Sequence, residues 1–125
     1  MVGSEQCIQF MTECLSLIQH KLPPIAVEAM AVAREYSAGR ISVRTVSEML
    51  VKCWEYLKEH HPGVLFEHPE VAALRAVICL LHAQKHPQAC NIVDHLSFFL
   101  WLVEDVESHR EQEEALLRKH FAKCL

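Results

Sequence analysis

Four residues that could hold a metal ion lie close together in the sequence: Cys79, His82, His86 and Cys90. Thiolate and imidazole groups at such separations can close a tetrahedral zinc site. Two features argue against this interpretation, because Pro87 interrupts the helix before the last of these residues and no Cys-x2-Cys pair accompanies them. We therefore predict no bound metal, and a metal-dependent enzyme that uses these four side chains is kept as an alternative hypothesis.

Other catalytic patterns are missing from the sequence. His82 and His86 are four residues apart, as in zinc proteases, but the residues between them supply no glutamate to act as a general base. Three glycines, at positions 3, 39 and 63, cannot build the glycine-rich loops that cradle nucleotide phosphates. Six cysteines and nine histidines make chance Cys-His pairs common, and no family signature surrounds any cysteine. We predict a protein with no enzymatic activity and no cofactor.

An acidic run follows an aromatic stretch near the end of the chain. The aromatic stretch contains Phe98, Phe99 and Trp101, and the acidic run consists of Glu104, Asp105, Glu107, Glu111, Glu113 and Glu114. A run of charges usually forms a solvated helix face. It can also be a docking surface for a basic partner, because complementary charge speeds encounter and rejects wrong partners. Protein interfaces combine aromatic anchors with a polar rim, so we predict that Trp101 and the six acidic residues bind a partner protein. Packing in the core is the alternative role of the aromatic residues.

The composition limits the class of protein and of partner. The chain has 125 residues, of which 51% are hydrophobic and 22% are charged, as expected for one globular domain covering residues 1–125. Twelve basic and sixteen acidic residues give a net charge of −4, which is the wrong sign for binding nucleic acid. The longest uncharged apolar stretch, residues 96–103, is far shorter than the roughly 20 residues that cross a bilayer. We expect neither nucleic acid nor a membrane as a partner.

The cysteines are expected to be reduced thiols. An even number of cysteines could form disulfides in a secreted protein. The N-terminal sequence MVGSEQC, however, has no basic region and places Glu5 where a signal peptide would carry positive charge. Most of the cysteines also fall on predicted apolar helix faces, where a free thiol behaves as a small hydrophobic group. We therefore predict a cytoplasmic protein with buried thiols.

Helical periodicity predicts an all-α, single-domain bundle of five to six helices. Apolar residues recur at spacings of three and four along most of the chain. In the third helix they predict one apolar stripe, made of Val43, Val46, Leu50, Cys53, Trp54 and Leu57. Local signals predict where the helices begin: after Ser4, at Pro24, after Ser42, near Pro69 and after Pro87. Order is therefore expected nearly throughout the chain.

Three details of the helices carry further expectations. Gly39 is expected in the left-handed conformation that ends the second helix, and Ser42 is expected to cap the third. Residues 64–66 are too short for a sheet and are expected to cover the helix ends as a hydrophobic plug. The fifth helix is apolar nearly all round, so it should lie in the middle of the bundle or have a partner on its far side. The residues after Val106 can continue as helix.

The stretch LPPIAVEAMAVAREYSAGRISV, residues 22–43, resembles small helical immunity proteins encoded beside bacterial toxins of the polymorphic and type VI secretion systems. In those proteins a proline opens an alanine-rich helix bearing a glutamate, an aromatic residue precedes a glycine, and an Ile-Ser-Val-like cap starts the next helix. The matching residues are Pro24, Glu28, Tyr36, Gly39, Ile41, Ser42 and Val43. The likeness extends more faintly through PEVAALRAVICLLHA, residues 69–83. The resemblance implies cytosolic binding and neutralisation of one cognate toxin, without catalysis.

Two hypotheses about function follow. In the first, the chain is an immunity protein that occludes the active site of a cognate toxin in a one-to-one complex, using the acidic run and exposed aromatic residues. In the second, it is a helical adaptor or secretion chaperone, which would form a dimer and bind several clients through an apolar groove.

Overall fold

The computed structural model describes residues 4–63, 68–88 and 93–122. Within these ranges the chain forms six α-helices, one short 3-10 helix and no strand. The elements are α1 (Ser4–Leu17), η1 (Gln19–Lys21), α2 (Pro24–Ser37), α3 (Val43–His60), α4 (Pro69–Lys85), α5 (Val93–Val106) and α6 (Arg110–Phe121). The prediction of an all-α bundle of five to six helices is confirmed. No helix in this part of the chain has both the length and the apolarity needed to span a membrane.

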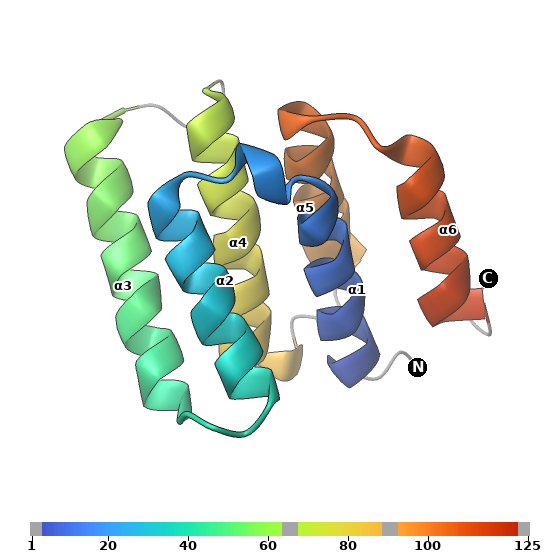
Figure 1. Cartoon of the computed structure of the whole chain (residues 1–125), viewed down its shortest axis with the longest axis horizontal. Helices are drawn as coiled ribbons and strands as arrows, with labels where there is room; N and C mark the ends of the chain where they lie inside the picture. The colour runs from blue at the N-terminus through green and yellow to red at the C-terminus, as the bar shows by residue number, and fades with distance from the viewer. Residues whose placement is uncertain (1–3, 64–67, 89–92, 123–125) are drawn as a thin grey trace.

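Helix α4 is the centre of the bundle. It packs against α1, α2, α3 and α5, and Figure 1 shows it behind α2. Almost every side chain along α4 is buried, including the small residues Ala72, Ala76 and Ala83. Small side chains let neighbouring helices approach closely on several sides at once. Of the two places expected for the fifth helix, the middle of the bundle is wrong, because α5 packs against α4 and α1 and its Trp101 is 49% exposed. The other, with a partner on its far side, stays a prediction.

The turn between α2 and α3 forms as the sequence predicts. Gly39 has a φ of +77°, and its amide donates a hydrogen bond to the Tyr36 carbonyl at 3.0 Å. The Arg40 amide donates to the Glu35 carbonyl, also at 3.0 Å, which completes a Schellman motif. Ser42 occupies the N-cap position of α3, but its side chain makes no capping hydrogen bond. The position of the cap is thus confirmed, whereas the expected side-chain bond is absent.

The last part of the chain turns back on itself after α5. The helix expected beyond Val106 is interrupted at residues 107–109 and resumes as α6. Helix α6 packs on α1, where the rings of Phe10 and Phe121 meet edge to face with 5.1 Å between their centroids. In Figure 1, α6 lies at the opposite edge of the bundle from α3. The plug predicted at residues 64–66 lies outside the described residues.

Candidate partner-binding face

A row of aromatic and cationic side chains crosses the face formed by α3, α4 and α5. Trp54 comes from α3, Arg75 from α4, and Phe98 and Trp101 from α5. The guanidinium carbon of Arg75 lies 5.2 Å from the centre of the Trp54 ring and 5.9 Å from the centre of the Phe98 ring. The rings of Phe98 and Trp101 follow, with 6.0 Å between their centroids. We call these four residues the aromatic row.

Both ends of the aromatic row are open to solvent. Trp54 is 46% exposed and Trp101 is 49% exposed. Between them, the guanidinium of Arg75 is attracted to the faces of two rings, which holds the rings at a defined spacing. Rigid aromatic side chains lose little conformational entropy on binding, which is one reason why Trp and Arg are frequent anchors of protein interfaces. The row therefore has the chemistry of an interface anchor.

A cavity of about 230 Å³ adjoins the aromatic row between α3, α4 and α5. The rings of His82 and His95 in its wall have 5.6 Å between their centroids. The ring of His95 also lies 3.3 Å from the carbonyl oxygen of Cys79. Burial, together with the charges of neighbouring basic groups, lowers the pKa of His82 below its usual value. The cavity is lined by the imidazole groups of His82 and His95, by apolar side chains and by Arg75.

The four residues with metal-ligand spacing are not brought together as one described site. The rings of His82 and His86 lie one helical turn apart on α4, with 4.9 Å between their centroids. Cys79 is buried, and burial raises the pKa of its thiol to about 12, which disfavours the thiolate that a zinc site requires. Cys90 lies outside the described residues.

The acidic run does not form one continuous surface. Asp105 on α5 and the pair Glu111 and Glu114 on α6 are exposed, as predicted for a docking surface. Glu104 and Glu107 are partly buried, and Glu113 is buried at 5% exposure. The expectation that all six carboxylates face solvent together is therefore wrong, because the break at residues 107–109 turns α6 so that Glu113 faces inward.

Glu104 and Glu107 are already engaged within the molecule. Glu104 accepts a hydrogen bond from the His109 amide at 3.0 Å and lies 3.5 Å from the Arg110 guanidinium. Burial opposes its ionisation, but these bonds outweigh burial and lower the pKa of Glu104 below its usual value. Glu107 lies 3.0 Å from the His20 ring and also contacts the His109 ring. These two carboxylates hold the α5–α6 turn.

Glu113 is held in an environment that favours its protonated form. Burial, and then the negative charge of Glu104, raise the pKa of Glu113 to about 7. One oxygen of its carboxyl group has no hydrogen-bond partner among the described residues. A buried carboxyl group with an unpaired oxygen is costly to ionise. Glu113 therefore belongs to the interior of the α5–α6 junction and not to a docking surface.

Sequence reasoning singled out Trp101 as a partner-binding residue, but it misplaced Trp54 and passed over Arg75. Trp54 was expected on the apolar stripe of α3 together with Val43. In the structure the buried face of α3 carries Val46, Met49, Cys53 and Leu57, while Val43 is 43% exposed and Trp54 sits beside the stripe. The spacing of these four buried residues along the sequence could have predicted this, because successive residues are about 100° apart around a helix and Trp54 directly follows Cys53.

Comparison of the chain with models of protein families, with curated proteins and with solved structures finds no match. The function has to be argued from the site, since a helical bundle hosts many functions. In the described part of the chain, the feature best suited to a function is the half-exposed aromatic row, with the exposed acids of α5 and α6 as a separate charged element.

Proposed function

We propose that this chain is an immunity protein that acts in the cytoplasm, where it binds one cognate bacterial toxin and neutralises it by covering the toxin's active site. The observation that carries the proposal is the aromatic row, because its two tryptophans are about half exposed at either end of one face. Large aromatic side chains of this kind anchor interfaces by filling pockets on the partner. The resemblance of residues 22–43 to immunity proteins supplies the class of partner.

The exposed acidic residues favour a basic partner. Asp105 follows Trp101 by one helical turn on α5, so both side chains lie on the same helix face. Glu111 and Glu114 are three residues apart and share a face of α6 in the same way. A toxin with an apolar pocket and a basic rim would complement this arrangement, and the net charge of −4 would speed the encounter.

The proposal is tested with the product of the gene next to the one that encodes this chain. Expression of that product alone should arrest bacterial growth, and co-expression of this chain should restore it. Titration calorimetry should give a one-to-one complex. Trp54→Ala and Trp101→Ala should each weaken binding by about 2 kcal/mol, which is roughly thirtyfold.

Val27→Ala is the matched control, because Val27 is an apolar residue of α2 that is 48% exposed and lies away from the aromatic row. This variant should bind the toxin as tightly as the wild type. Circular dichroism should find all three variants folded, since each replaced side chain is about half exposed. A neighbouring product that is not bound, or tryptophan variants that bind like the control, would overturn the proposal.

The alternative is a helical adaptor or secretion chaperone. It is favoured by a second hollow of about 440 Å³, where α1, α2 and α6 meet beside Ile8, Thr12 and Lys119. A protein of this class would use the hollow to bind several clients and would form a symmetric dimer. Light scattering on the purified chain separates the two hypotheses, since a monomer favours the immunity protein and a dimer favours the adaptor.

A further inference from the structure

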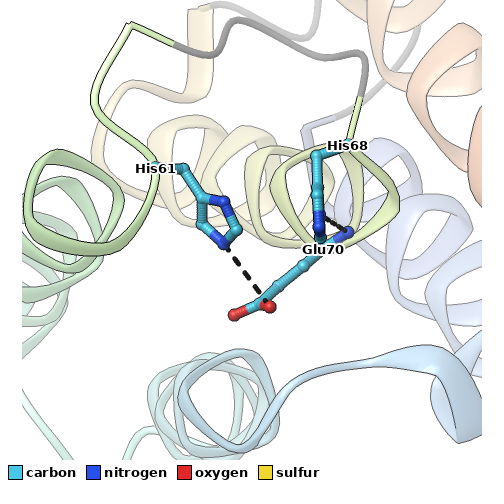
Figure 2. A group of neighbouring side chains, drawn as sticks. All are labelled: His61, His68 and Glu70. Carbon is cyan, nitrogen blue, oxygen red and sulfur yellow. Dashed lines mark hydrogen bonds and ion pairs between the residues drawn. The ribbon is translucent and has the colours of Figure 1, made fainter.

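Three potential metal ligands converge where α3 ends and α4 begins, as Figure 2 shows. His61 directly follows α3, His68 is the N-cap residue of α4, and Glu70 lies in the first turn of α4. One ligand atom from each residue lies within 4.8 Å of the others. The His61 Nε2 atom is 3.4 Å from a carboxylate oxygen of Glu70, and the two imidazole rings have 4.5 Å between their centroids.

The donor set is suited to a zinc-like divalent ion. Two imidazoles and one carboxylate are the protein ligands of many zinc sites that keep a fourth position open. Ligand atoms about 2 Å from a tetrahedral zinc ion lie roughly 3.3 Å apart, so modest rotation of the three side chains would close the site. Magnesium and calcium prefer a shell made only of oxygen atoms, which this cluster cannot supply.

The carboxylate of Glu70 is positioned by a neighbouring residue. The hydroxyl group of Tyr56 on α3 donates a hydrogen bond to the carboxylate of Glu70. This bond fixes the orientation of the carboxylate and ties it to α3. The side chains of His61 and Glu70 are only 15% and 29% exposed. Two of the three ligands are therefore partly shielded from water and held by contacts between α3 and α4.

The third ligand, His68, already has a structural task. Its Nδ1 atom accepts a hydrogen bond from the Glu70 amide at 3.1 Å and so caps the N-terminus of α4. A metal ion bound at Nδ1 would take the same lone pair, and an ion bound at Nε2 would leave the proton on Nδ1. Ligation by His68 therefore replaces the cap with a coordinate bond. A useful variant at His68 must therefore remove the metal ligand while it keeps a side chain that caps α4.

We propose that His61, His68 and Glu70 bind one zinc ion, which joins the end of α3 to the start of α4. The proposal does not depend on the immunity function. The spacing of these residues along the chain does not predict this site, because six residues separate the two histidines and the packing of α4 against α3 brings them together.

The test is calorimetric titration with zinc chloride, supported by the visible absorption of cobalt(II) as a probe of coordination geometry. All proteins carry His82→Asn and His86→Asn, because those two histidines lie one turn apart on α4 and could bind zinc by themselves. In this background we expect one zinc ion per chain and the intense absorption of four-coordinate cobalt. His68→Asn is the decisive variant, since asparagine keeps an N-cap side chain while it removes the imidazole.

His68→Asn and Glu70→Gln should each weaken zinc binding more than tenfold, and Tyr56→Phe should weaken it about tenfold as the loss of an outer hydrogen bond. His60→Asn is the matched control and should bind zinc like the background, because His60 stacks on Tyr56 but is not a ligand. Zinc should also raise the melting temperature of the background and of the control, but not that of His68→Asn. A background protein that binds no zinc, or a folded His68→Asn variant that binds it equally well, would overturn the proposal.

Discussion

The buried carboxyl group of Glu113 links the stability of the protein to pH. Its pKa is about 7 in the folded protein, against an ordinary value of 4.5 that it regains on unfolding. Because the folded state holds this proton more tightly, the stabilisation is complete below about pH 4.5 and is lost as the pH rises through about 7. We predict that Glu113→Gln, which stays neutral, matches the wild type near pH 5 and exceeds its stability by about 1 to 2 kcal/mol near pH 8.

Guanidinium unfolding of both proteins at the two pH values measures this difference. The comparison is made between wild type and variant, since the charge of Glu104 lies beside Glu113 and affects both curves. Glu111→Gln, a change on the same helix at an exposed position, should show no such dependence on pH. If the gain from Glu113→Gln were the same at both pH values, the proton would not be bound as we describe.

At the scale of one element, Gly39 determines how α2 ends. Its φ of +77° lies in the left-handed region, and a Cβ atom added there would meet no atom within 4 Å. Any loss of stability on Gly39→Ala would therefore come from the backbone conformation alone. We predict a loss of about 1 kcal/mol for Gly39→Ala and a smaller one for Gly39→Asn, because asparagine tolerates this conformation better. Urea unfolding with an unchanged slope measures both, and an alanine variant as stable as the wild type would contradict the prediction.

Helix boundaries could be predicted because they depend on local residues, while the partners of each helix could not. Pro24, Gly39 and Pro69 begin or end helices through their own backbone limits, and the structure agrees with each. The apolar surface of α5 predicted either a central helix or one with a partner on its far side, but the helix at the centre of the bundle is the alanine-rich α4. The inward turn of Glu113 also depends on how α6 folds back onto α1, which is a contact between distant parts of the chain.

In the candidate site, likewise, single residues could be predicted from the sequence but their contacts could not. Trp101 could be singled out from its place before the acidic run, and the structure leaves it half exposed. Its neighbours Trp54 and Arg75 come from two other helices, so no spacing along the chain reveals the aromatic row. The proposed ligands His61, His68 and Glu70 likewise could not be predicted, because the packing of α4 against α3 brings them together.

At the scale of the whole molecule, the thiols report on opening of the core. The four cysteines in the described residues are fully or almost fully buried, and they come from three helices: Cys7, Cys14, Cys53 and Cys79. Burial raises the pKa of the Cys53 and Cys79 thiols to about 12. A thiol reagent attacks only the thiolate, so both exposure and ionisation must increase before these groups react.

We predict that the four buried thiols of the folded protein resist a disulfide reagent such as DTNB, and that all four react once guanidinium unfolds the chain. Cys90→Ser and Cys124→Ser are introduced first, because those two positions lie outside the described residues. With these changes, labelling in dilute guanidinium should rise in step with the loss of helix measured by circular dichroism, since one cooperative core is expected to open as a unit. Rapid labelling of one thiol without denaturant would instead place that part of the core in a separate, less stable unit. Cys79 is the most informative thiol, because it lies on the central helix beneath the aromatic row.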